Sequence, residues 1–144
     1  MGNRSTVIVL SLVLGLLFTL CPSCSLERNT VVSPPTTPKN QPVIVSATDA
    51  FTFTVDAANF SYSTTQAVTF SGDSLVVTLV VTNYSLGTGE IESVTADGTQ
   101  FYSEVLNGNR TAVLAVVAPS TPRSVSVSLA GYTGTVSFVL ARKK

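Results

Sequence analysis

Residues 75–83, LVVTLVVTN, decide the fold of this chain. Side chains along an extended strand alternate between two faces, whereas a helix returns to one face every three to four residues. The alternation here gives an apolar face of Leu75, Val77, Leu79 and Val81 and a mixed face of Val76, Thr78, Val80 and Thr82. We therefore predict a central β-strand whose first face lies in the core.

The two-residue period extends outward from this stretch, and no window shows the apolar stripe of a helix. Asp97-Gly98 is the strongest two-residue hairpin signal, Asn107-Gly108-Asn109 predicts a second hairpin, and Gly87-Thr88-Gly89 predicts a connecting turn. The expected strands cover residues 43–47, 51–56, 67–71, 75–83, 91–95, 100–106, 112–118, 124–130 and 135–141.

Several of these strands place Val, Leu or Phe on one face and Ser or Thr on the other. Such strands are typical of an antiparallel sheet with one wet side, and about seven to nine of them at a spacing of about 8–12 residues are typical of a sandwich. We predict an all-β fold: an antiparallel two-sheet sandwich, immunoglobulin-like or a related Greek key, with the jelly roll as an open alternative. The predicted organisation is a signal peptide over residues 1–24, a linker over 25–42 and the sandwich over 43–144.

Residues 48–144 resemble a bacterial immunoglobulin-like module of the kind found in surface proteins. The resemblance rests on Ser- and Thr-rich strands, on the Asp97-Gly98 hairpin and on the closing strand over residues 134–138. It implies the same architecture for this chain. The chain departs from antibody domains, because it lacks their Cys, Trp, Cys signature and because neither Tyr102 nor Tyr132 stands in a tyrosine-corner motif.

The first residues are predicted to form an export segment. Arg4 precedes a mostly apolar run over residues 7–20. A basic start, an apolar run and small residues together form a secretory signal peptide, and this run stops at Cys21-Pro22, short of the about 20 apolar residues that a membrane-spanning helix needs. We expect the protein in the bacterial cell envelope or at the cell surface.

Two cleavage sites are consistent with the end of this segment. Residues 20–25, LCPSCS, resemble the box at which bacterial lipoproteins are cleaved and lipidated, which implies a lipid anchor on Cys24; Cys21 and Pro22 depart from the usual pattern. The alternative is ordinary cleavage after Ser25, which gives a secreted chain. Cys21 and Cys24 also have the spacing of a redox pair, but such a pair needs a helix N-terminus after a strand.

Residues 25–42, SLERNTVVSPPTTPKNQP, are rich in Pro, Thr and Ser. Proline lacks a backbone donor, so this segment favours an extended spacer of about 3.1 Å per residue over a helix or an interior strand. We expect it to tether the domain to the anchored Cys24. A disordered N-terminus without an anchoring role is the alternative.

Composition excludes several classes of function. Lys plus Arg and Asp plus Glu each number 8, so no basic field is present to attract nucleic acid. The chain has no His, which removes the common nucleophile pairs and the imidazole metal ligand. We expect no enzyme activity, no cofactor and no metal.

Candidate ligand-binding residues are Tyr84, Tyr102, Asn109 and Arg110. The two tyrosines could offer rings to a sugar or a peptide, and the other two residues lie in a predicted loop. Binding groups concentrate in the loops of such scaffolds, so we expect function in the segments 87–90, 107–110 and 119–123.

Other polar groups have structural interpretations. Glu90 and Glu92 share a strand face and are expected to form a charged edge rather than a catalytic pair. Turn chemistry explains Asp73 and Asp97 without calcium. The basic residues 142–144 are expected to cap the last strand.

The sequence favours a small exported, lipid-anchored module that displays or binds a protein or glycan without catalysis. The alternative is an assembly subunit, a homo-oligomer in which a strand of one chain is added to the sheet edge of another. The arms that could be added contain Val31-Val32 or Val43-Ile44-Val45.

Overall fold

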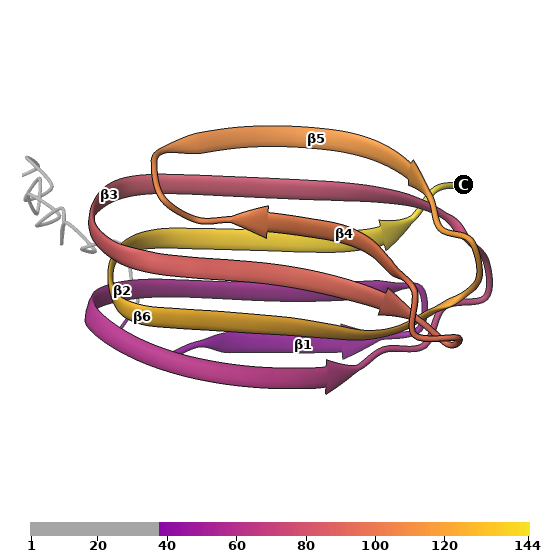
Figure 1. Cartoon of the computed structure of the whole chain (residues 1–144), viewed down its shortest axis with the longest axis horizontal. Helices are drawn as coiled ribbons and strands as arrows, with labels where there is room; N and C mark the ends of the chain where they lie inside the picture. Colours follow the sequence, from indigo (N-terminus) through magenta and orange to yellow (C-terminus); the bar gives the residue numbers. More distant parts are fainter. Residues whose placement is uncertain (1–37) are drawn as a thin grey trace, which may run out of the picture. The chain divides into compact units, whose positions relative to one another are not determined.

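The computed structural model describes residues 38–144, which contain β-strands and no helix (Figure 1). Cys24, the predicted signal peptide and linker residues 25–37 lie outside the described residues. Within residues 38–144 there is no helix that is long enough and apolar enough to span a membrane. The strands are β1 (Val43–Ala47), β2 (Ala50–Ala67), β3 (Ser74–Thr95), β4 (Gln100–Val105), β5 (Arg110–Val117) and β6 (Pro122–Arg142).

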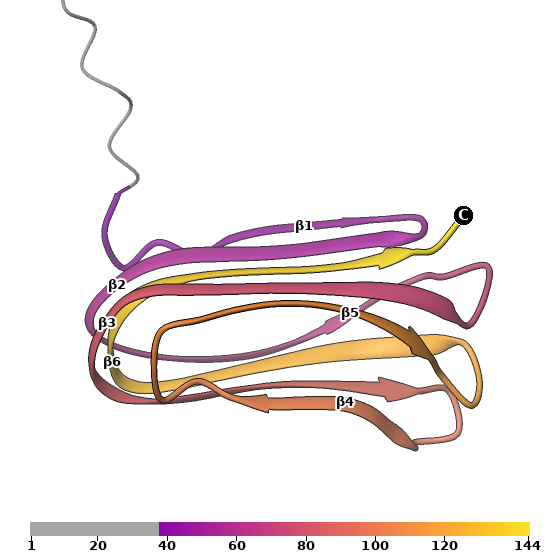
Figure 2. The same cartoon turned by 90° about the horizontal axis from the view of Figure 1, so that it is seen from above.

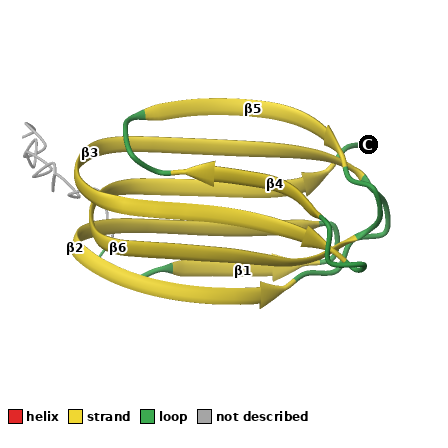
Figure 3. Cartoon of the chain, viewed as in Figure 1, coloured by secondary structure: helices red, strands yellow, loops and turns green. Residues whose placement is uncertain are grey.

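All six strands belong to one antiparallel sheet (Figure 3). The order is β1-β2-β6-β3-β4, and β5 pairs with β3 off this path. The 22 residues of β3 allow it to pair with β5 along residues 74–81 and with β4 along 90–94, while β6 pairs with both parts of it. The prediction of an all-β antiparallel fold is confirmed.

The three long strands, β2, β3 and β6, turn back on themselves at one end of the sheet (Figure 2). The backbone there enters the left-handed region, with φ of 49° at Asn59, 55° at Asn83 and 55° at Gly131. Asn and Gly tolerate this region better than other residues. We call residues 58–61, 83–88 and 131–134 the bend. It folds the sheet so that the two halves of each long strand face each other (Figure 2).

The core lies between these facing halves. The apolar face of the predicted central strand is at most 1% exposed at each of Leu75, Val77, Leu79 and Val81, so that prediction is confirmed. Phe51 and Phe138, from neighbouring strands, are fully buried with ring centroids 6.3 Å apart. Burying side chains of this size contributes about 1.5–3 kcal/mol each, which drives the sheet to fold over.

Three local predictions are wrong. Residues 68–71 are not strand, because β2 continues through 57–66 and ends at Ala67. The turn expected at Gly87 lies inside β3, since its φ of 87° bends the strand without ending it. Residues 107–109 do not close a hairpin: β4 and β5 pair with different parts of β3.

The hairpin predicted at Asp97-Gly98 is confirmed in position, but its loop is longer than the expected two residues and covers residues 96–99. It joins β3 to β4, and Gly98 has a φ of 85°. Thr95 N donates to Thr99 O at 3.0 Å, and the Asp97 carboxylate accepts a bond from Thr99 N at 3.0 Å. The aspartate therefore ties the loop to its own backbone, as Asp does in turns.

The last residues of the predicted linker are fastened to the sheet. Asn40 N donates to Asp56 O at 2.8 Å, and Asn40 Oδ1 accepts from Ala58 N at 2.7 Å. Asn40 Nδ2 also donates to Ala58 O at 3.2 Å. The side-chain amide of Asn40 thus bonds to both backbone groups of Ala58, as a neighbouring strand would. From this contact beside the bend the chain continues into β1.

Candidate interaction surface

β5 has a strand partner on one side only (Figure 1). It carries apolar side chains that solvent reaches. Val113 is 66% exposed, Val117 74% and Leu114 43%. We call these three residues the β5-edge surface. Scattered apolar residues are common on proteins, but their concentration on an unpaired strand marks a place where another chain can pair.

The unpaired side of β5 offers backbone donors and acceptors. β5 pairs with β3 without a register shift, and just beyond it Ala118 N donates to Asp73 O at 2.9 Å. Alternate residues of an antiparallel strand direct their backbone groups to opposite sides. Even-numbered residues therefore bond to β3, and the outward groups belong to Thr111, Val113, Ala115 and Val117.

β5 lacks the features that protect the other edges. Between Thr111 and Val117 it has no charge, no proline and no bulge. β4 is 6 residues long and carries Glu104, and β1 is 5 residues long. The second part of β2, along residues 60–67, is rich in Ser and Thr. Within residues 38–144, β5 is therefore the longest apolar edge.

Tyr84, Asn109 and Arg110 come together where the β4–β5 connection meets the bend. Asn109 Oδ1 accepts from Tyr84 N at 2.9 Å, and the Tyr84 hydroxyl donates to Gly87 O at 2.8 Å. Arg110 forms an ion pair with Glu104. The structure thus joins three of the four predicted binding residues, but through contacts internal to the chain. Those contacts position the start of β5.

Tyr102, the fourth predicted residue, lies in the core. It is 7% exposed, and its ring centroid is 5.6 Å from that of Phe138. Burial raises the pKa of its hydroxyl to about 12, with a further contribution from the Glu104 charge. The ring is therefore not available to a ligand on the surface.

The three loops in which function was expected do not form one cluster. Residues 87–90 belong to β3, so they are not a loop. The connections before and after β5 lie at opposite ends of that strand (Figure 1). A single ligand site built from all three segments is therefore excluded.

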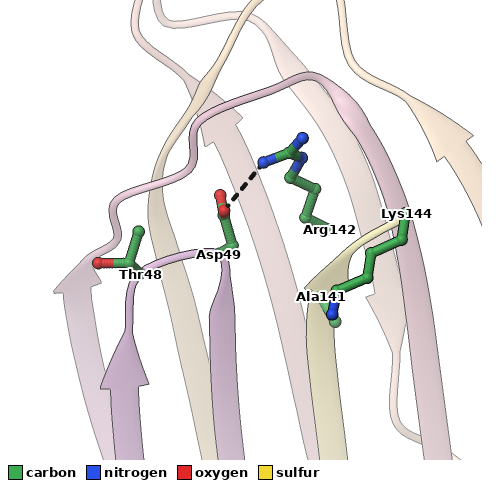
Figure 4. Close-up of a pocket in the computed structure, with 5 residues that line it drawn as sticks. All are labelled: Thr48, Asp49, Ala141, Arg142 and Lys144. Carbon is green, nitrogen blue, oxygen red and sulfur yellow. Dashed lines mark hydrogen bonds and ion pairs between the residues drawn. The ribbon is translucent and has the colours of Figure 1, made fainter.

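A shallow pocket of about 550 Å³ lies where the β1–β2 turn meets the end of β6, lined by Thr48, Asp49, Ala141, Arg142 and Lys144 (Figure 4). Arg142 Nη1 lies 3.2 Å from Asp49 Oδ2. Asp49 also accepts bonds from Ser71 N at 2.6 Å and from Ser71 Oγ at 2.8 Å. Asp49, Ser71 and Arg142 satisfy one another, so this charged pair joins segments of the chain within the pocket.

Two further carboxylates, those of Glu90 and Glu92, make contacts between neighbouring strands. Glu90 accepts from Ser103 Oγ at 3.2 Å, and Glu92 accepts from Gln100 Nε2 at 3.1 Å. Among residues 38–144, no three His, Cys, Asp or Glu side chains lie close enough together to hold a metal ion. Glu90 and Glu92 each have a partner on β4 and are not directed at one common point.

No protein-family model matches the sequence, and no curated protein matches it. Function is therefore inferred from the residues and geometry of the chain itself.

Sequence reasoning did not single out the β5-edge surface, although a signal was present. Residues 75–83 carry Thr on their second face, whereas residues 112–118, AVLAVVA, are apolar on both faces. A strand of that kind is either buried on both sides or leaves an apolar face exposed. Only the pairing of β5 distinguishes the two cases.

Proposed function

We propose that this chain is a non-catalytic, exported and lipid-anchored β-module that binds another protein chain by strand addition at the β5 edge. The observation that carries the proposal is the coincidence of outward backbone groups with exposed apolar side chains at Val113 and Val117. Backbone hydrogen bonds supply affinity in this mode of recognition, and alternate side chains supply specificity.

A protein partner fits this surface better than a glycan. Sugars are bound by flat exposed aromatic rings with free polar groups beside them, and the β5-edge surface is aliphatic. Tyr84, the other tyrosine candidate, is partly buried with its ring centroid 5.7 Å from that of Tyr132, and its hydroxyl already donates to Gly87 O. Aliphatic side chains beside free backbone groups match an extended polypeptide.

The Val43-Ile44-Val45 arm does not serve as the added strand in this arrangement. β1 already pairs with β2 of its own chain, with Val43 opposite Thr54 and Val45 opposite Thr52. The role that suits the chain is that of acceptor through β5.

Export and anchoring rest on the leader and on Cys24. A lipid anchor followed by the proline-rich segment would hold the β5 edge away from a membrane, where another chain can reach it. The absence of His among all 144 residues supports a role without catalysis, because the usual general base is missing.

We further propose that the folded sheet acts as a two-layer sandwich of the jelly-roll kind. One layer would hold β1, the first half of β2, the second half of β6, the first half of β3 and β5. The other would hold the second half of β2, the first half of β6, the second half of β3 and β4. Each connection at the bend would then cross between layers, as in a Greek-key sandwich.

Site-specific photo-crosslinking tests the proposed function. A photoreactive residue is placed at Val113 of the full chain in a bacterial host, and a matched chain carries it at Leu86, which is 61% exposed but lies inside the bend. We expect a discrete crosslinked protein product from position 113 and none from position 86. No product at 113, or equal products at both, would contradict binding at the β5 edge.

A further inference from the structure

We propose that the strand received by β5 is β5 of a second copy of this chain, in an antiparallel register centred on Leu114. This inference rests on the proposed function of the edge. It names the partner and the residues that face each other across a two-fold axis. A two-fold interface requires a surface that is complementary to itself, and β5 meets that requirement in register, shape and charge.

The register follows from the outward backbone groups. Centring on Leu114 places Val113 opposite Ala115 of the second copy, and Thr111 opposite Val117 of the second copy. All four residues direct their N–H and C=O groups away from β3. Each facing pair can therefore exchange two hydrogen bonds, as in the closely bonded pairs of an antiparallel ladder. A register shifted by one residue would set outward groups against groups already bonded to β3.

Side chains also match across this axis. Leu114, 43% exposed, meets its own counterpart in a pair without backbone hydrogen bonds, where side chains approach most closely. Val117 and Val113 lie beside Thr111 and Ala115 of the second copy on the outer face. Pairing thus sets Leu114 against a leucine, and Val113 and Val117 beside the small, uncharged side chains of Ala115 and Thr111.

Charge does not oppose the pairing. Residues 111–117 contain no ionisable group, and Arg110 at the end of β5 is already paired with Glu104 of its own chain. The sequence has 8 basic and 8 acidic side chains, and removal of residues 1–24 takes away only Arg4, so two copies repel each other little as whole molecules. A basic or acidic partner would gain no electrostatic attraction from this uncharged edge, whereas an identical uncharged edge meets no electrostatic repulsion.

The length of the contact predicts a weak dimer. The 8 residues of β5 extend for about 27 Å at about 3.4 Å per residue. One strand pair covers less surface than the about 1,200–2,000 Å² of a stable interface. Two copies anchored in one membrane would be concentrated by their tethers, which compensates for a weak contact.

Charge reversal at the axis tests the inference. Full chains with two different epitope tags are co-expressed and crosslinked in intact cells with a bifunctional photoreactive reagent, while both copies are still in one membrane. They are then solubilised in mild detergent and captured through one tag. Leu114→Lys in both copies sets two lysines opposite each other, and Leu114→Glu in both sets two glutamates. We expect each variant alone to reduce co-capture by at least about tenfold, and Leu114→Lys co-expressed with Leu114→Glu to restore it. Leu86→Lys, at an exposed leucine away from the edge, is the matched control and should not change co-capture.

Several outcomes would overturn the two-fold pairing: no co-capture of the unaltered chains, undiminished co-capture of either variant alone, or no recovery in the mixed pair. The crosslinker at Val113, in otherwise unaltered tagged chains, gives a second readout that does not depend on how the Leu114 variants fold. We expect its product to contain both tags. A product that joins one tag to a different protein would overturn pairing with a second copy and leave the proposed function intact, whereas no product would overturn both.

Discussion

Asp49 joins three separate parts of the chain. It sits in the β1–β2 turn with a left-handed φ of 66°. Its carboxylate accepts bonds from Ser71 in the β2–β3 connection and pairs with Arg142 at the end of β6. Its backbone N–H donates to Thr69 O and its carbonyl accepts from Arg142 N, both at 2.9 Å. The side chain and backbone of Asp49 therefore hold three segments together at the end of the sheet opposite the bend.

We expect Asp49→Asn to remove part of the acid sensitivity of folding. The backbone and side-chain bonds from Ser71, together with Arg142, hold the pKa of Asp49 below its usual value. A depressed pKa means that the carboxylate stabilises the fold above about pH 4, and that this contribution is lost as pH falls through the folded-state pKa. Urea unfolding at pH 7 and pH 3 should show the variant less stable at pH 7 and closer to the unaltered chain at pH 3.

The control for that comparison is Asp56→Asn. Among the described residues the Asp56 side chain makes no hydrogen bond or ion pair, so its substitution should leave the difference between the two pH values unchanged. An equal loss for both variants at pH 7 would contradict a specific role for Asp49.

Tyr102 and Tyr132 predict a loss of stability in alkali. Burial raises the pKa of each hydroxyl to about 12, with Tyr84 adding to the effect at Tyr132. The folded state then holds the phenol proton more tightly than the unfolded state, so stability is intact below about pH 10 and falls between about pH 10 and 12. The loss is on the order of 2 kcal/mol per tyrosine.

Absorbance titration of tyrosinate checks this prediction. The part of the absorbance change that occurs near pH 12 should be smaller in Tyr132→Phe and in Tyr102→Phe than in the unaltered chain. Neither hydroxyl has a hydrogen-bond partner within the described residues, so at pH 7 each substitution should cost little stability or add some. A large loss at pH 7 would show that the hydroxyl has a partner.

The bend determines how the long strands fold over. At Gly87 the backbone is left-handed, and a Cβ there would lie 2.4 Å from the carbonyl oxygen of Gly131 in β6. At Gly134 a Cβ would lie 3.0 Å from the Cα of Tyr84. The two bent strands therefore approach as closely as their backbones allow, which explains why this end of the sheet uses glycine.

We expect Gly87→Ala to destabilise the protein more than Gly98→Ala. The two glycines have similar φ, 87° and 85°, so alanine costs about 1–2 kcal/mol of backbone strain at either position. Only Gly87 adds a clash, because nothing lies within 4 Å of a Cβ at Gly98. The difference in free energy of unfolding, measured in urea, should exceed about 2 kcal/mol. Equal losses would show that the bend can relax.

β5 shows how the same residue type serves two purposes. Val77 in β3 is 1% exposed, whereas Val113 and Val117 in the adjacent β5 are mostly exposed. The two valines of β5 lie opposite Thr78 and Ser74, on the outer face of the sheet. Leu114 lies opposite Val77 on the core face and is still 43% exposed, because β5 has a strand on one side only. Edge position converts an ordinary apolar strand into a surface that can accept another strand.

The proposed lipid anchor on Cys24 makes a prediction for the protein as a whole. In a bacterial host the unaltered chain should appear in the membrane fraction with the mass of a lipidated N-terminus at Cys24. Cys24→Ala should abolish that mass and release the protein, because a single residue carries the anchor. Cys21→Ala is the control and should leave the mass of the mature protein unchanged. Equal mass and equal release of the unaltered and Cys24→Ala chains would exclude lipid at this position.

Much of the local structure could be predicted from the residues. The apolar face from Leu75 to Val81, the Asp97-Gly98 hairpin and the all-β class follow from side-chain alternation and turn chemistry, which act over neighbouring residues. The candidate surface could be predicted less well. Tyr102 was expected as a possible binding residue but lies against Phe138. Its burial depends on which strands pack against its face of β4, and the sequence near Tyr102 does not specify those strands.

What the sequence determined by itself is the β-character of the chain, the positions of its turns where Gly and Asp stand together, and the absence of His chemistry. Only the tertiary structure decided that 57–66 continues β2, that Gly87 bends a strand without ending it, and that β5 lies at an edge. The physical reason is the separation in sequence over which each effect acts. Alternation and turn preference depend on adjacent residues, whereas continuity through a bend and exposure of an edge depend on partners such as β6, which are distant in sequence.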